Sequence, residues 1–377
     1  MAYSATRPTP EVIDEQKSQP ETHAGRLETA STDAFKGICI FLIIFGHNKS
    51  LEYASPEFRA FLYLFHVAMF LYLPFLRPWQ TWGRAKPLDL IIRYGWPCVA
   101  FTFVYSLIFV KFSGRSLTEV PMLVAEAVLA MSARGFDHAT GLQLLWFLPA
   151  LIGIRFAMML VAPLAGAQLW PVLAVAAFAH SLVGLLPESL KYVTPFGWPI
   201  AALLLFPGMV IALLDLGRRR IPVWMLIGLG AIALTLVLAT GLINRGHPLN
   251  VGMIFVPSIA TPFKLIALDL IQIWAFVTLM AVSRLLPMQR LFGGLGRMSF
   301  ELFVLHQPIY IGIRAISPTV LVTSWGPWLT GAVTLALTIA IAVGVAVAIR
   351  SVPPVHRLLF PAGVGSFGRL WNPHLQQ

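Results

Sequence analysis

The segment FKGICIFLIIFGHNKS, residues 35–50, carries a lysine and a histidine at the two ends of an apolar stretch. Ten residues without a charged or amide side chain separate Lys36 from His47. In a helix, eleven steps of 100° and 1.5 Å amount to about three turns plus 20°, and to roughly 16 Å of rise. We therefore expect Lys36 and His47 to lie on one face of one helix, near its opposite ends.

The composition indicates the surroundings of that helix. The chain has 377 residues, of which 58% are hydrophobic and 11% are charged. A soluble domain carries about 25% charged residues. Apolar runs long enough to cross a bilayer recur along the whole chain. The sequence therefore predicts an all-α polytopic membrane protein.

About ten transmembrane helices are predicted from the length and spacing of the apolar runs. The ranges are 34–50, 60–77, 88–111, 143–163, 168–186, 197–214, 222–243, 264–285, 298–316 and 325–349. We expect a membrane domain at 33–350 between a disordered cytoplasmic tail, 1–32, and a cytoplasmic C-terminal tail, 351–377.

Four prolines fall inside these predicted spans. Pro97, Pro149, Pro207 and Pro308 each lack a backbone N–H and are expected to kink their helices. A kink within a bilayer leaves a carbonyl group that neighbouring helices must satisfy.

The chain has 27 Lys and Arg residues against 16 Asp and Glu residues. The basic residues are scattered among short loops, which does not suit a nucleic-acid interface. The loop at 215–221, which contains Arg218, Arg219 and Arg220, is expected on the cytoplasmic side. We therefore predict a protein of the cell membrane with both termini in the cytoplasm.

Cys39 and Cys98 lie within apolar spans and indicate neither a disulfide framework nor a metal site.

Ionisable side chains within the spans are costly in a bilayer and are candidates for function. If the N-terminus is cytoplasmic, basic side chains lie toward the inner face, whereas histidines and a carboxylate lie toward the middle and the outer face. The inner group is Lys36, Arg93 and Arg155, and the second group is His47, His66, His306 and Asp269. This division suits a reaction between an anionic donor on the inner side and an acceptor on the outer side.

Single residues of this set also have structural explanations. Lys36, Arg93 or Arg155 could extend its charged end to the interface. His66 or His306 could complete a hydrogen bond between helices. Lys36 and His47 together, on one face of one apolar helix, are harder to explain without a buried cavity.

The segment DAFKGICIFLIIFGH, residues 33–47, resembles the first helix of the membrane-bound acyltransferase-3 family, close to its fucose-O-acetylase-like branch. Members of the family carry a basic residue, ten intervening residues and a histidine. Lys36 and His47 occupy these places, and Gly37 and Gly46 match the glycines common in this branch.

Four further segments resemble family motifs in the same order. LFHVAMFLYLPF, residues 64–75, places His66, and LDLIIRYGWPCVAF, residues 88–101, places Arg93. LLWFLPALIGIR, residues 144–155, resembles the helix that contains the family's WFL motif and places Trp146. GRMSFELFVLHQPIY, residues 296–310, resembles a late S-x-E-x-Y-x-x-H-x-P helix and places Ser299, Glu301 and His306.

The resemblance implies transfer of an acyl group, usually acetyl, from cytoplasmic acyl-CoA to a hydroxyl on an extracytoplasmic glycan or related envelope molecule. Lys36, Arg93 and Arg155 would hold the anionic coenzyme at the inner face. The remaining candidates, for binding of the acceptor, are His66, Trp146, Glu301 and His306. No metal is expected.

An ester forms from a thioester only if the attacking hydroxyl loses its proton. Histidine is suited to accept this proton near neutral pH, and His47 is the candidate general base. A covalent acyl-imidazole on His47 is an alternative. The roughly 16 Å between Lys36 and His47 resembles the reach of an extended pantetheine arm. Two other functions stay open: a transporter that relays protons through buried His and Asp residues, and a flippase with the same polar cavity.

Overall fold

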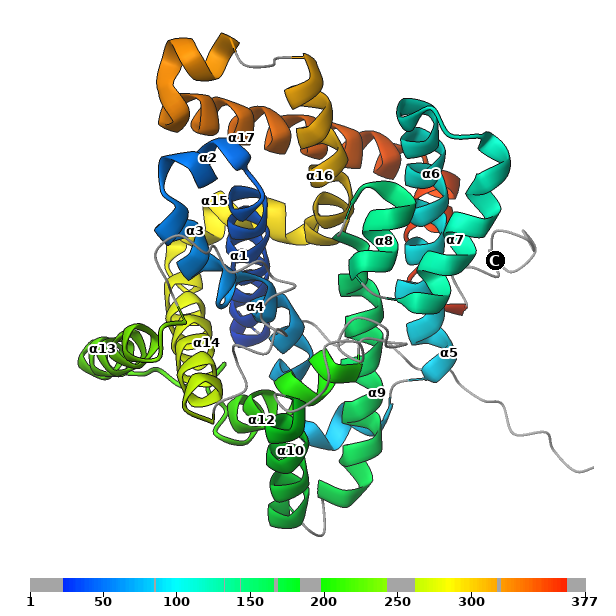
Figure 1. Ribbon diagram of the computed structural model, residues 1–377. Coiled ribbons are helices and arrows are strands. Elements are labelled where there is room, and N and C mark those ends of the chain that lie inside the picture. Colours follow the sequence, from blue (N-terminus) through cyan, green and yellow to red (C-terminus); the bar gives the residue numbers. More distant parts are fainter. Residues whose placement is uncertain are drawn as a thin grey trace, which may run out of the picture.

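The computed structural model describes residues 23–84, 86–131, 133–142, 144–165, 169–183, 198–242, 262–316 and 320–364, and these ranges contain helices and no strands. The all-α polytopic architecture is therefore confirmed. The main helices are α1 (His23–Gly46), α3 (Pro56–Tyr63), α4 (His66–Tyr72), α6 (Trp96–Ser113), α9 (Phe147–Ala165), α10 (Leu169–Val183), α12 (Trp198–Leu213), α13 (Val223–Ala239), α14 (Pro262–Ser283), α15 (Leu286–Arg297), α16 (Ser299–Ile316) and α17 (Val320–Ser351) (Figure 1). Shorter elements connect them: α2 (Lys49–Ala54), η1 (Leu73–Leu76), η2 (Trp79–Arg84), α5 (Pro87–Leu90), η3 (Ile91–Gly95), η4 (Leu117–Glu119), α7 (Val120–Ala130), α8 (Ala133–Thr140), η5 (Leu144–Trp146) and α18 (Pro353–Leu359).

Six segments within the described residues are long and apolar enough to cross a bilayer. They are Glu28–Gly46, Pro56–Leu76, Pro87–Ser113, Leu144–Leu164, Phe263–Ser283 and Gly326–Ser351. Shorter apolar helices cover Trp170–Val183, Ala201–Leu213 and Val223–Ala239. With α16, these segments correspond in order to the ten predicted spans.

The boundaries of the first span differ from the predicted 34–50. The helix α1 begins at His23, and Glu28 within it pairs with Arg218 at 2.9 Å, so the first helix starts before the predicted span. The same helix ends at Gly46 because Asn48 begins α2, accepting a hydrogen bond from the Ser50 N–H at 3.1 Å. His47 lies in the turn between the two helices, where its own N–H still bonds to the Ile43 carbonyl at 3.1 Å.

The central helix α1 crosses α15 at very short range (Figure 1). A Cβ atom at Gly37 would overlap the Phe292 carbonyl, and one at Gly296 would overlap the Asp33 carbonyl. Small residues at a crossing let two membrane helices approach to backbone contact. This contact fixes the position of α1 along its axis relative to the end of α15. The helix α16, which begins at Ser299, follows directly after α15.

Two of the four prolines are compensated as expected. Pro308 in α16 leaves the Val304 carbonyl without its helical partner, and the Tyr105 hydroxyl donates to this carbonyl at 2.9 Å. Pro207 in α12 leaves the Leu203 carbonyl free in the same way. The oxygen of this carbonyl lies 2.7 Å from Nδ1 of His180.

Pro97 lies at the start of α6, directly after η3, a π-helical turn that joins α5 to α6 without interrupting the helical backbone. A proline inside a helix and a π-helical turn both disturb the regular helical hydrogen bonds. Pro97 therefore lies in a distorted stretch of helix. Pro149 lies in the first turn of α9, where a proline is tolerated.

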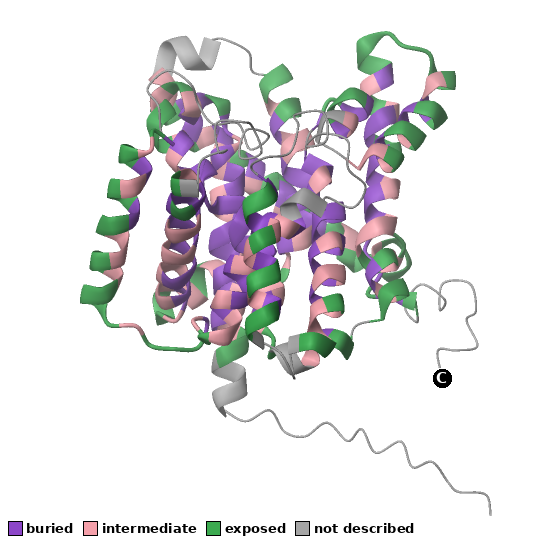
Figure 2. Cartoon of the chain, turned by 60° about the horizontal axis from the view of Figure 1, so that its bottom comes forward, coloured by how far each residue is buried: buried purple, intermediate pink, exposed green. Residues whose placement is uncertain are grey.

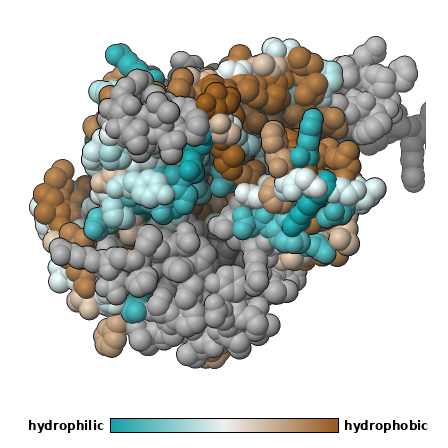
Figure 3. Space-filling view, turned by 45° about the horizontal axis from the view of Figure 1, so that its top comes forward, coloured by the Kyte–Doolittle hydropathy of each residue, from teal (hydrophilic) through white to brown (hydrophobic). Residues whose placement is uncertain are grey.

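Burial is concentrated in the middle of the bundle (Figure 2), and the outer faces of the peripheral helices are exposed. Trp224 and Ile227 on α13 are among many large apolar side chains that lie exposed, as expected for helices that face lipid. Viewed toward α2 and α17, hydrophilic side chains gather in patches beside apolar surface (Figure 3).

Candidate functional site

A cavity of about 820 Å³ lies between α1, α4, η1, η3, α9 and α16. Seven of the described side chains that line it are basic and two are acidic. The basic ones are Lys36, Arg77, Arg93, Arg155, Arg218, Arg297 and Arg350, and the acidic ones are Glu28 and Asp33. The wall of this cavity therefore carries an excess of positive charge.

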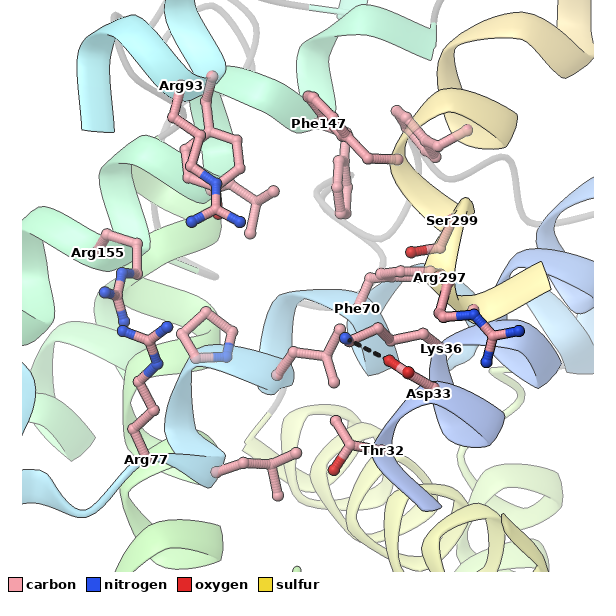
Figure 4. A pocket seen from close by; sticks show the side chains of 18 of the residues that line it. Thr32, Asp33, Lys36, Phe70, Arg77, Arg93, Phe147, Arg155, Arg297 and Ser299 are labelled. Atoms are coloured by element: carbon pink, nitrogen blue, oxygen red, sulfur yellow. Dashed lines mark hydrogen bonds and ion pairs between the residues drawn. The ribbon is translucent and has the colours of Figure 1, made fainter. Parts of the chain in front are cut away.

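Three of the basic side chains have carboxylate partners. Lys36 Nζ lies 3.0 Å from Asp33, one turn earlier on α1 (Figure 4). Arg218 pairs with Glu28 at 2.9 Å. The guanidinium of Arg350 pairs with Glu301 at 2.6 Å.

The other four arginines lack a carboxylate partner among the described residues. Arg77, Arg93 and Arg155 come from three segments and form one wall of the cavity (Figure 4). The charges of Arg77 and Arg93 both act on Arg155, which is only 9% exposed. The fourth arginine, Arg297, lies at the end of α15 on the opposite side. Of these four arginines only Arg155 is buried, and the other three are exposed. Like charges gathered around one cavity favour binding of an anion between them.

The local structure explains how Arg93 reaches the cavity. It lies in η3, a single π-helical turn between α5 and α6. Such turns occur frequently at functional sites because they redirect side chains within a helix. The guanidinium also lies 5.5 Å from the Tyr94 ring centre, a cation–π distance.

The structure brings Lys36, Arg93 and Arg155, predicted as the donor-binding set, to this one cavity. Arg77, Arg297 and Arg350 also line it, although the sequence does not single them out as binding residues. They lie at or just beyond the ends of apolar segments, so the sequence alone does not separate orienting charges from binding charges.

A second cluster lies beyond the end of the cavity, where three histidines meet: one in the turn after α1, one at the start of α4 and one in α16. The ring centres of His47 and His306 are 5.3 Å apart. His66 lies beside Tyr63 with a separation of 4.6 Å, and its ring closely approaches Gly46. The structure therefore brings together His47, His66 and His306, which the sequence assigned to catalysis and acceptor binding.

Two of these histidines have a tautomer fixed by the backbone. Nδ1 of His66 lies 2.7 Å from the Leu62 carbonyl, and Nδ1 of His306 lies 2.8 Å from the Phe303 carbonyl. A carbonyl only accepts, so Nδ1 carries the proton and Nε2 presents a lone pair. Both Nε2 atoms are buried without a hydrogen-bond partner among the described residues. The His47 imidazole is only partly buried, and no described residue hydrogen-bonds it.

Glu301 and Trp146 lie apart from the histidines. Glu301 is buried near the other end of α16 and contacts both Arg350 and His356, the latter at 3.1 Å. It therefore holds Arg350 at the edge of the cavity. Trp146 packs against Phe147 where η5 meets α9, with ring centres 6.3 Å apart.

Asp269 belongs to a third place in the bundle. Its carboxylate lies 3.1 Å from His180 Nε2, and His180 also contacts the carbonyl freed by Pro207. The pair thus joins α10, α12 and α14 as a structural connection between helices.

The family model that describes an acyltransferase domain, that of the acyltransferase-3 family, matches residues 29–347. Comparison with curated proteins and with solved structures gives no match. The match spans both the arginine-lined cavity and the histidine cluster. The chain therefore belongs to the acyltransferase-3 family of membrane acyltransferases.

Proposed function

We propose that this protein transfers a short acyl group, acetyl in the simplest case, from cytoplasmic acyl-CoA to a hydroxyl of an extracytoplasmic glycan or related envelope molecule. This activity corresponds to the fucose-O-acetylase-like branch of the family. The observation that carries the proposal is the wall of Arg77, Arg93 and Arg155, which faces the cavity without carboxylate partners among the described residues. The phosphate groups of coenzyme A supply the negative charge that this wall requires.

The proposed chemistry uses the two ends of α1. Lys36, kept in place by Asp33, lies with the arginines at the donor end, and His47 lies at the other end. The acceptor hydroxyl forms a bond to the acyl carbon as the carbon–sulfur bond breaks. His47 takes the proton from the hydroxyl and returns it to the leaving thiolate, so that an ester and free coenzyme A result.

His66 and His306 support the acceptor end of this proposal. Each presents a buried Nε2 that can only accept a hydrogen bond in its neutral form. An acceptor rich in hydroxyl groups supplies the matching donors. We propose Trp146 and Glu301 as further residues of this site, Glu301 acting through the position of Arg350.

The orientation of the chain is part of the proposal. Glu28 near the start of α1, Arg218 and Arg350 at the end of α17 line the same cavity. The first turns of α1, the 215–221 loop and the end of α17 therefore lie at one end of the bundle. A cytoplasmic donor requires that this end faces the cytoplasm of the cell, with the catalytic membrane domain at 33–350 between two cytoplasmic tails.

A proton-coupled transporter is the second candidate. It would use Asp269, the carboxylate among the outward candidates. His180 contacts Asp269 with one ring nitrogen and, with the other, the Leu203 carbonyl that Pro207 leaves free, which gives the pair a structural role. The pair also lies outside the arginine-lined cavity. The geometry thus favours the acyltransferase over the transporter.

The direct test compares envelope glycans by mass spectrometry with and without the gene. Transfer predicts the loss of an acetyl-sized mass increment in the deletion strain and its return with the wild-type gene. The Arg155→Ala gene should restore little of it. If glycans from both strains have identical masses, an envelope glycan is not the acceptor.

A further inference from the structure

Three phenylalanine rings close the outer end of the donor cavity. Phe70 comes from α4, Phe147 begins α9 and Phe303 lies in α16. The Phe147 and Phe303 ring centres are 4.5 Å apart, and the Phe70 ring meets Phe147 at 6.2 Å and 89°. All three side chains are buried. They form a packed set that we name the phenylalanine gate.

Each member of the gate is the outermost cavity-lining residue of its helix. On α16, Ser299, Phe300 and Phe303 line the cavity, whereas His306, one turn further, does not. On α4, His66 lies one turn beyond Phe70 and is likewise absent from the lining. The gate therefore lies between the arginine wall and the histidine cluster.

The same separation holds along α1. Lys36 lines the cavity, but Ile40 and Ile43 on the face between Lys36 and His47 are fully buried. Beyond the gate, the His306 ring lies 6.0 Å from Phe303 and is itself fully buried. Close packing of this kind leaves little space for a bulky group.

We propose that the phenylalanine gate must move to admit the thioester end of the donor to His47, and that it limits the transferred acyl group to a short chain. This inference rests on the proposed function, because it takes acyl-CoA as the donor. A chain longer than acetyl extends beyond the thioester carbonyl, into the space filled by the three rings and His306. Each additional methylene then displaces packed side chains, which is how an apolar pocket discriminates by length.

The test measures binding of coenzyme A, acetyl-CoA, butanoyl-CoA and octanoyl-CoA to the full-length protein in lipid nanodiscs. The wild type should bind acetyl-CoA more tightly than octanoyl-CoA. In Phe303→Ala, the affinity for octanoyl-CoA relative to acetyl-CoA should rise by about tenfold or more. Phe303→Leu and Phe147→Leu are smaller changes that test the same point if the alanine variant does not fold.

Phe292→Leu is the matched control. Phe292 is half-buried against Phe41 at 5.7 Å, and it does not line the cavity. Its substitution should leave the length preference unchanged, and thermal unfolding should show that all variants are folded.

Two results separate the possible failures. If the wild type binds neither coenzyme A nor acetyl-CoA, the proposed donor is wrong and the gate has no substrate. If coenzyme A binds but chain length has no effect in the wild type or in folded gate variants, the donor stands and the gate is overturned.

Discussion

The two ends of α1 differ in how their polar groups are satisfied. At the end that carries Lys36, seven basic side chains surround an open cavity, and four of the arginines lack a carboxylate partner among the described residues. At the end that carries His47, the neighbouring His66 and His306 are fully buried, with tautomers fixed by backbone carbonyls. In the proposed function, the first arrangement binds the charge of the donor and the second accepts a proton. One helix would then separate recognition of a donor from the chemistry performed on it.

The largest effect is expected at His47. Substitution by Ala or Gln removes the proposed general base, whose loss costs about 10²–10⁴ in rate. Acyl transfer should fall below detection in cells, while expression and membrane insertion are kept, because the side chain is only partly buried. The product is measured by mass spectrometry.

His138→Ala provides the control for this prediction. His138 is largely exposed on α8, lies 3.6 Å from Glu126 and does not line the arginine-rich cavity. Near wild-type transfer by a folded His47→Ala protein would move the catalytic role to another residue.

A smaller but clear loss is expected at Lys36. Lys36→Ala should remove most of the transfer activity, because it deletes a cavity charge and leaves Asp33 unpaired beside the donor. Lys36→Arg should keep much of the activity, since the charge and the ion pair survive. Equal activity of the two variants in an acyl-CoA turnover assay would argue against a charge contact.

The smallest effect is expected at Glu301. Glu301→Gln keeps the shape of the side chain but removes the charge that holds Arg350 and His356. We expect the KM for acyl-CoA to rise several-fold with a smaller change in kcat, since Arg350 stays present but is less ordered. A lower kcat at an unchanged KM would instead place Glu301 at the reacting groups.

The architecture and the charged candidates could be predicted from the sequence for a physical reason. Hydropathy fixes which segments span a bilayer, and the position of a residue along its span fixes its depth. Lys36, Arg93 and Arg155 were therefore expected at the same level, and the structure places them around one cavity.

The details that could not be predicted depend on packing between helices. The phenylalanine gate requires three rings from α4, α9 and α16 to meet, which no single segment encodes. The end of α1 at Gly46 depends on Asn48, whose amide Nδ2 donates to the Gly331 carbonyl on α17 at 2.8 Å. Pro149 lies in the first turn of α9 and not in its interior, which could not be predicted because apolar composition alone does not show where a helix begins.

The affinity for acetyl-CoA, measured by calorimetry on three proteins in nanodiscs, tests the separation of the two ends most directly. Loss of a charge-assisted contact to a phosphate group costs about ten- to a hundredfold in affinity. Arg155→Ala should show this weakening, whereas His47→Ala should bind acetyl-CoA as the wild type does while transferring nothing. Unchanged affinity in a folded Arg155→Ala protein, or equal weakening in both variants, would contradict the assignment of donor binding to the arginine wall.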